Sequence, residues 1–214
     1  MSWLDILYPP TCVSCEAPGA WLCDPCLSRI GMFHHPVEAP SSVKAALACG
    51  SYADPVLRSV ITSFKYRSAR CLTSAWTKIL RQYRSSYAES WPWAGLDHLT
   101  VVSIPSDPKR MRKRGMDHAA ILADLVRQEL VPWAARSSFL KRAKSVSQNA
   151  ALPPDATRAA NVRGAFEAVS SIATTPVLLV DDVLTTGATS AEAARVLLDA
   201  GAPAVYLFVM ARGS

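Results

Sequence analysis

Residues 177–190 read VLLVDDVLTTGATS and combine two kinds of binding chemistry within one short stretch. Asp181 and Asp182 supply adjacent carboxylates, which accept hydrogen bonds from vicinal hydroxyls and hold Mg²⁺ through water molecules. Residues 185–189 supply hydroxyls, a glycine and backbone N–H groups at the start of an expected helix, where a phosphate binds favourably. A ligand that uses both halves carries a monophosphate joined by a short spacer to a diol, as ribose 5-phosphate does.

The candidate phosphate ligands are Thr185, Thr186, Gly187, Ala188 and Thr189. The three threonines offer hydroxyl donors, and the two small residues let the backbone approach an anion closely. Two other nucleotide loops are excluded, because a Walker loop requires GxxxxGK[S/T] and a dinucleotide fingerprint requires GxGxxG. This stretch has one glycine and no lysine.

Four cysteines near the N-terminus form two CxxC pairs: Cys12, Cys15, Cys23 and Cys26. Two such pairs this close together can place four thiolates around Zn²⁺. Four free thiols or two disulfides are the alternatives, although disulfides are disfavoured in a cytosolic chain. Because four thiolate ligands leave no open coordination position, we expect a structural zinc knuckle and not a catalytic metal centre.

Basic residues are concentrated in one region of the chain. Ten lysines and arginines lie between residues 104 and 144, against four acidic residues, so this region accounts for the whole net charge of +6. A patch of this kind fits a nucleic acid or a polyphosphate ligand. An ordinary solvated basic face is the alternative.

The elements that would position these residues alternate along the chain. Apolar or β-branched runs at residues 99–104, 177–181 and 204–210 are typical of buried strands, and residues 137–140 are a candidate short strand. A first helical pattern begins at residue 54, and further helical patterns cover residues 71–83, 117–130 and 190–200. Asp117 is the expected N-cap of the helix at residues 117–130. The alternation predicts an α/β fold with a mostly parallel sheet flanked by helices.

The N-terminal region differs from the rest in composition. Residues 1–40 contain the four paired cysteines and several prolines without a periodic apolar pattern. We therefore divide the chain into a small zinc-binding module, residues 1–40, and a second domain, residues 41–214. No apolar run approaches the roughly 18 residues of a membrane span. The first residues lack a basic stretch and include Asp5, so we expect no signal peptide, no membrane insertion and a cytoplasmic location.

The stretch at residues 177–190 closely resembles the motif by which type I phosphoribosyltransferases bind 5-phosphoribosyl-1-pyrophosphate (PRPP). The whole chain resembles the ComF/GntX-like (competence protein F) family, which joins an N-terminal zinc knuckle to a phosphoribosyltransferase domain. Besides the cysteines, the matching segments are Phe64-Lys65-Tyr66, the proline-led basic loop 105–115, Gln148, Arg158, residues 161–166 and Ala211-Arg212. Met116-Asp117-His118 departs from the family, whose members often carry an aromatic residue followed by Asn-Gln there.

The resemblance implies a type I phosphoribosyltransferase-like fold and a role for each motif. Asp181 and Asp182 would be the catalytic acids that contact the ribose hydroxyls, and residues 185–189 would bind the 5-phosphate. Pyrophosphate would be bound by the basic loop, and we assign this role to Lys109, Arg110 and Arg114. Residues 141–161 are a candidate lid, and Lys144 and Gln148 are its candidate site residues. The implied reaction is Mg²⁺-dependent transfer of phosphoribosyl to an unknown acceptor with release of pyrophosphate.

Two other functions fit the same sequence. A non-catalytic regulator could bind PRPP or a nucleotide on the same fold. An accessory protein for competence and DNA uptake could instead handle single-stranded DNA with the basic region and the zinc module, together with other competence proteins. The intact loop favours retained ligand binding over an inactive scaffold, and it does not distinguish binding from turnover.

Overall fold

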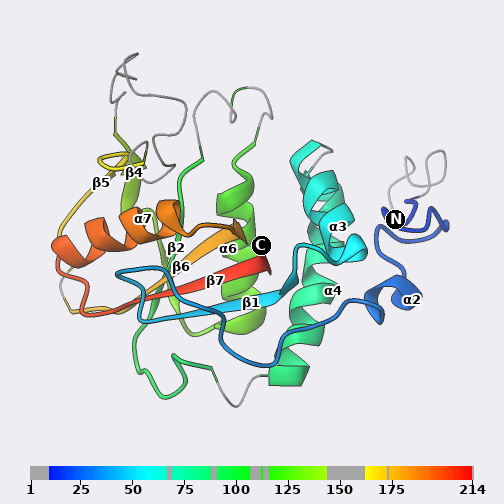
Figure 1. The fold of residues 1–214 in the computed structure, drawn as a ribbon, viewed down its shortest axis with the longest axis horizontal. Coiled ribbons are helices and arrows are strands. Elements are labelled where there is room, and N and C mark those ends of the chain that lie inside the picture. The colour runs from blue at the N-terminus through cyan, green and yellow to red at the C-terminus, as the bar shows by residue number, and fades with distance from the viewer. Residues whose placement is uncertain are drawn as a thin grey trace.

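The computed structural model describes residues 10–66, 69–87, 91–106, 112, 116–143, 162–172 and 174–213 (Figure 1). The elements are, in chain order, α2 (Asp24–Leu27), β1 (Ala45–Ser51), α3 (Pro55–Tyr66), α4 (Ala69–Tyr87), β2 (Thr100–Ser103), α6 (His118–Leu130), β3 (Ala135–Ser137), β4 (Leu140–Arg142), β5 (Phe166–Ala168), β6 (Val177–Leu184), α7 (Ala188–Asp199) and β7 (Val205–Arg212). Within the described ranges, no helix combines the length and the hydrophobicity that crossing a bilayer requires.

The main sheet has five strands among the described residues, in the order β1-β7-β6-β2-β3. Every neighbouring pair in this sheet is parallel. β4 and β5 form a separate antiparallel pair. The predicted mostly parallel α/β sheet is therefore confirmed. Because all five strands run the same way, their carboxyl ends lie at one edge, and β6 reaches that edge at the centre of the sheet.

Helices cover both faces of the sheet (Figure 1). On one face, α3, α4 and α6 pack against side chains such as Leu178 and Val180 of β6. On the other face, α7 and the β4–β5 pair pack against the alternate side chains, such as Val177 and Leu179. Successive residues of a strand point to opposite faces, so a strand buried on both sides has the unbroken apolar sequence seen here.

Several element boundaries differ from the sequence expectation. The predicted strand at residues 137–140 is wrong, since β3 ends at Ser137 and β4 begins at Leu140. β6 continues three residues past its expected end because β7 pairs with it as far as Leu184. β1 was not expected, because its sequence, AALACGS, consists of small residues in place of β-branched ones. These small residues are almost fully buried, and only long-range pairing with β7 reveals the strand.

The N-terminal region packs on the same core as the helices beside it. Cys12, Leu22, Cys26 and Ile30 are buried in one cluster with side chains of α3 and α4. The following segment runs antiparallel to β1 through two isolated bridges and covers the edge of the sheet. The division of the chain at residue 40 remains a prediction.

Candidate functional site: an acid pair followed by a phosphate loop

The acid pair, Asp181 and Asp182, lies within the last half of β6. Asp181 is opposite Val209 of β7, and both acidic residues are half-buried. Oδ1 of Asp181 accepts a hydrogen bond from the backbone N–H of Asp182 at 2.8 Å. The pair is therefore held in the central strand at the edge where open α/β sheets bind their ligands.

The alternation of side chains shifts by one residue across the acid pair. Before the pair, Leu179 packs on the α7 side of the sheet and Val180 on the α6 side. After the pair, Val183 packs on the α6 side and Leu184 on the α7 side. Strict alternation would place residues 179 and 183 on the same side. In a regular strand the two adjacent carboxylates would project to opposite faces of the sheet. The shift in alternation removes this constraint.

The phosphate loop, residues 185–189, connects β6 to α7. Thr185 and Thr186 are exposed, whereas Gly187 is buried and adopts φ 77° as the N-cap of α7. Gly187 makes no side-chain cap, and the first helical hydrogen bond runs from Ala191 N to Gly187 O at 2.8 Å. The backbone N–H groups of the first turn therefore point out of the helix, where they can bind an anion. Thr189 lies in this first turn.

The segment that precedes β1 lies against the phosphate loop. A Cβ placed on Gly187 would be 2.7 Å from Cγ and 2.9 Å from Cβ of Pro40. Pro40, Thr186 and Gly187 line two adjoining cavities of about 510 and 150 Å³. A glycine is thus needed at position 187 both for its positive φ and for the close approach of Pro40. Sequence inspection gave no indication of this contact.

Arg212 is a second residue whose role was not apparent from the sequence. From the end of β7, its Nη1 donates to the carbonyl oxygens of Leu184, at 3.1 Å, and Thr185. The backbone N–H of Gly213 also donates to Leu184 O at 2.7 Å. These bonds tie the beginning of the phosphate loop to the neighbouring strand. The resemblance included Arg212 but implied no role for it.

A charged group lies beside the larger cavity, on the second turn of α7. Glu192 accepts hydrogen bonds from Nε and Nη2 of Arg195 and, at 2.7 Å, from the backbone N–H of Gly164. The hydrogen bonds from Arg195 are the main cause that lowers the pKa of Glu192, while its burial opposes the shift. Glu192 is therefore ionised at neutral pH. It links α7 to the turn that contains Arg163, which also lines this cavity.

The carboxyl end of β2 lies beside the acid pair. Ser103 is opposite Val180, and the backbone N–H of Ile104 donates to Val180 O at 3.1 Å. The chain leaves the sheet here and enters the basic loop, residues 105–115. Of the residues predicted to bind pyrophosphate or to form the lid, the following lie outside the described residues: Lys109, Arg110, Arg114, Lys144 and Gln148.

Met116, Asp117 and His118 lead from the basic loop into α6. Asp117 caps α6 by accepting hydrogen bonds from the backbone N–H groups of Ala119 and Ala120, as the sequence predicted. His118 is buried, and its ring meets the edge of Phe64 with centroids 5.1 Å apart. The fold thus brings together two segments that are far apart in the sequence.

The cysteine quartet, Cys12, Cys15, Cys23 and Cys26, converges on one point. The four Sγ atoms all lie within 4.8 Å of one another, and those of Cys15 and Cys23 are 3.5 Å apart. Zn–S bonds of about 2.3 Å in tetrahedral geometry place sulfur atoms about 3.8 Å apart. The quartet can therefore hold a zinc ion with small adjustments. Nζ of Lys78 on α4 fixes the module by donating to Leu22 O.

The thiols of the quartet differ in their tendency to ionise. Burial raises the pKa of Cys26 to about 12, and contacts with the thiols of Cys15 and Cys23 add to this effect. Burial also acts to raise the pKa of Cys12, but backbone hydrogen bonds from Cys23, Cys15 and Ser14 outweigh it and lower that pKa to about 6. Four clustered thiols thus resist ionising together, and a divalent cation is the group that would favour four thiolates.

Comparison with known proteins gives similarity in structure alone. No family model and no curated protein matches the sequence. Nineteen chains of solved structures match. The structure of an allosteric regulatory enzyme of purine biosynthesis has a TM-score of 0.44 at 19% identity, over 70% of this chain and 30% of that chain. Glutamine PRPP amidotransferase from B. subtilis, complexed with ADP and GMP, has a TM-score of 0.43 at 20% identity with the same coverage.

A hypoxanthine phosphoribosyltransferase from Staphylococcus aureus has a TM-score of 0.37 at 12% identity, over 64% of this chain and 62% of that chain. The chain matches only 30% of the length of the first two proteins. Similarity at this level assigns neither a substrate nor an activity to this chain.

Proposed function

We propose that the protein binds PRPP at the carboxyl edge of its main sheet. The phosphate loop would bind the 5-phosphate through hydroxyls and backbone N–H groups, and the acid pair would accept hydrogen bonds from the ribose hydroxyls. The supporting observation is that β6 carries the acid pair directly before the loop that opens α7, with only Val183 and Leu184 between them. A monophosphate next to a diol is the chemistry that this order of groups fits best.

The pyrophosphate end of PRPP requires positive charge near the acid pair. We assign this role to the basic loop, with Lys109, Arg110 and Arg114 as the proposed ligands, because the chain enters this loop beside Val180. The carboxylates of Asp181 and Asp182 are hard oxygen donors of the kind that Mg²⁺ prefers. When bound there, Mg²⁺ would neutralise part of the charge on the pyrophosphate.

The proposed reaction is displacement at C1 of the ribose. The nucleophile of an unknown acceptor forms a bond to C1 while the bond from C1 to the pyrophosphate oxygen breaks, and pyrophosphate leaves with the bonding electrons. The protein contributes by positioning the two reactants and by stabilising charge in the transition state. Asp181 and Asp182 would hold the ribose, and Lys144 and Gln148 would belong to the lid that excludes water.

Membership of the ComF/GntX-like family and a link to competence belong to the same proposal. They rest on the sequence resemblance. A structural zinc in the cysteine quartet rests instead on the spacing of the two CxxC pairs, and the geometry of the quartet accommodates the ion. A cytoplasmic location is part of the proposal, because a reducing compartment keeps cysteines available to bind zinc.

Calorimetric titration with PRPP and Mg²⁺ tests the proposal. Asp181→Asn combined with Asp182→Asn should weaken binding at least tenfold, about 1.4 kcal/mol. Asp199→Asn is a matched control, because it removes a carboxylate at the opposite end of α7, where Asp199 pairs with Arg195. Absence of PRPP binding by the wild-type protein, or equal affinity of the double variant, would reject the proposal. Release of pyrophosphate in the presence of candidate acceptors would then distinguish a transferase from a regulator that only binds PRPP.

Binding of single-stranded DNA is the second candidate function. Of the ten basic residues counted between residues 104 and 144, Arg136, Lys141 and Arg142 interact with groups of the protein itself. A DNA surface would therefore depend mainly on residues 109–114. Neutralising Arg110, Arg112 and Arg114 should abolish a salt-dependent affinity for single-stranded DNA if this function exists.

A further inference from the structure

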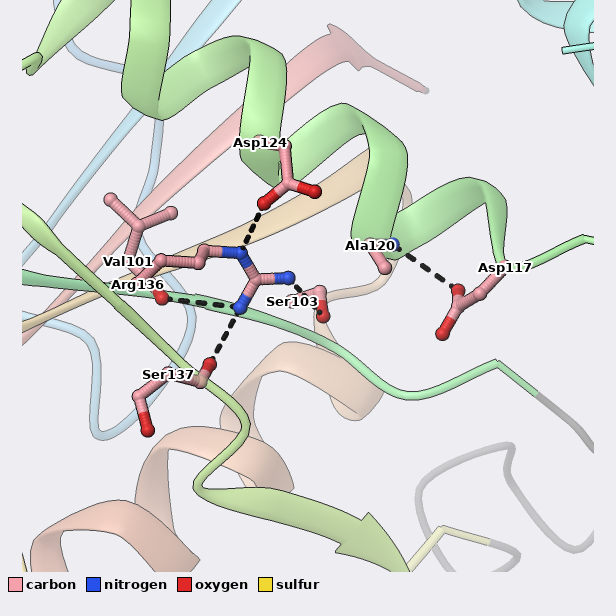
Figure 2. Close-up of polar contacts among 7 residues, drawn as sticks. All are labelled: Val101, Ser103, Asp117, Ala120, Asp124, Arg136 and Ser137. Carbon is pink, nitrogen blue, oxygen red and sulfur yellow. Dashed lines mark hydrogen bonds and ion pairs between the residues drawn. The ribbon is translucent and has the colours of Figure 1, made fainter. Parts of the chain in front are cut away.

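Arg136 connects three elements at the carboxyl end of β2 (Figure 2). From β3, its Nη2 donates to Oγ of Ser103 at 3.1 Å, and its Nε donates to Oδ1 of Asp124 on α6 at 2.8 Å. Its Nη1 donates to Ser137 O at 2.6 Å and to Val101 O at 3.4 Å. The Arg136 side chain is only 20% exposed, so these bonds are partly shielded from water. A planar guanidinium with several donors fixes the direction of each partner as well as its position.

Arg142 holds the residues that follow. From β4, its Nε donates to the carbonyl oxygen of Pro105 at 3.2 Å, and its guanidinium lies over the ring of Phe166 at 5.2 Å from the centroid. The two arginines therefore hold the chain from both sides, at Ser103 and at Pro105. This is where the chain passes from the sheet into the basic loop.

The position of this clamp relates it to the proposed PRPP site. Ser103 is opposite Val180 in the parallel register, and the next residue of β6 is Asp181. At the far end of the basic loop, the carboxylate of Asp117 caps the first turn of α6 (Figure 2). The described residues on both sides of the loop are thus fixed by specific hydrogen bonds.

We propose that Arg136 is a positioning residue for the pyrophosphate end of PRPP. With Arg142, it fixes Ser103 and Pro105, through which the chain enters the basic loop beside the acid pair. Arg136 touches no ligand itself, because its donors are directed to Ser103, Ser137 and Asp124. This inference rests on the proposed function. It also removes two arginines from the positive surface that the sequence had offered to nucleic acids.

The test compares two ligands that differ only in the pyrophosphate group. Calorimetry measures the affinity of the wild-type protein and of Arg136→Met for PRPP with Mg²⁺ and for ribose 5-phosphate. Arg136→Met should bind PRPP about tenfold more weakly, about 1.4 kcal/mol, and ribose 5-phosphate within twofold of the wild type. The PRPP affinity of Arg136→Lys should be closer to that of Arg136→Met than to that of the wild type, because an ammonium cannot reproduce the fork of bonds to Ser103 and Ser137.

Arg81→Met is the matched control. Arg81 also forms a paired contact with a carboxylate of α6, that of Glu129, but its side chain is 69% exposed and both of these hydrogen bonds go to Glu129. It should leave both affinities unchanged. Equal weakening of both ligands by Arg136→Met, or no weakening of PRPP, would overturn the positioning role. If Arg136→Met does not fold, Ser103→Ala carries the same test, since it removes one acceptor alone.

A readout without ligand separates this inference from the proposed function. The backbone N–H of Ile104, bonded to Val180 O, should exchange with deuterium faster in Arg136→Met than in the wild type or in Arg81→Met. Unchanged exchange would contradict the clamp even if PRPP binds. Faster exchange in a protein that binds neither ligand would keep the clamp and reject the proposed function.

Discussion

Replacing Gly187 by alanine tests whether the phosphate loop has the shape described above. The backbone of Gly187 has φ 77°, a conformation that costs an L-residue about 1–2 kcal/mol. The added Cβ would also lie 2.7 Å from Cγ of Pro40. Overpacking of this kind costs about 1–3 kcal/mol. We therefore expect Gly187→Ala to lower the free energy of unfolding by about 2–5 kcal/mol.

Gly95 provides a control for the backbone term. It has φ 81°, and no atom lies within 4 Å of a Cβ built on it. Gly95→Ala should therefore lower the free energy of unfolding by only about 1–2 kcal/mol. Urea unfolding of the two variants and the wild type gives the difference, which measures the contact with Pro40. A Gly187→Ala loss no greater than that of Gly95→Ala would refute this contact.

A double-mutant cycle with Pro40→Gly sharpens the result. Removing the ring should relieve the clash, so that Gly187→Ala in the Pro40→Gly background destabilises by about the same amount as Gly95→Ala. A coupling energy near zero would show that the added methyl group meets something other than Pro40. Gly187→Ala should also bind PRPP more weakly, because a shifted residue 187 turns the first N–H groups of α7 away from the phosphate.

Metal content and pH dependence give further predictions. Metal analysis should find about one zinc per chain; Cys26→Ser should lose it, and Cys49→Ala, at a buried cysteine outside the quartet, should retain it. Protein that folds fully without metal would contradict this expectation. Glu192→Gln should lower the free energy of unfolding at pH 7 by about 1–2 kcal/mol, because it removes charge-assisted hydrogen bonds from Arg195. Folding lowers the pKa of Glu192, so the wild type should keep this stability advantage at pH values above 4.5, the ordinary pKa of the glutamate side chain. It should lose the advantage as the pH falls through the lower pKa of Glu192 in the folded state. Urea titrations at pH 7 and pH 3 measure the change, and a constant difference would count against an ionised Glu192.

Some features of the site follow from neighbouring residues in the chain. The acid pair and the phosphate loop lie within one 14-residue stretch, so their order on a strand and a helix start could be predicted from local pattern. The same is true of Asp117 as a helix cap and of the two CxxC pairs, whose short spacing already favours convergence. Each of these depends on contacts between residues that are close in sequence.

Other features depend on contacts that the sequence does not display. β1 consists of small residues and becomes a strand only because it pairs with β7. Pro40 meets Gly187, and Arg212 meets Thr185, across separations that no local pattern encodes. Arg136 belonged to a region that charge alone presented as a binding surface, yet its side chain is only 20% exposed and its guanidinium is bonded to other parts of the protein.

The sequence by itself therefore determined which chemical groups this protein carries and in what local order. The tertiary structure decided which of them face a ligand and which hold the fold. The physical reason is that charge and side-chain type are properties of single residues, whereas burial and hydrogen-bond partners arise when distant segments pack. Arg136 shows the difference most directly, because the same positive charge that suggested a ligand instead binds Ser103, Ser137 and Asp124.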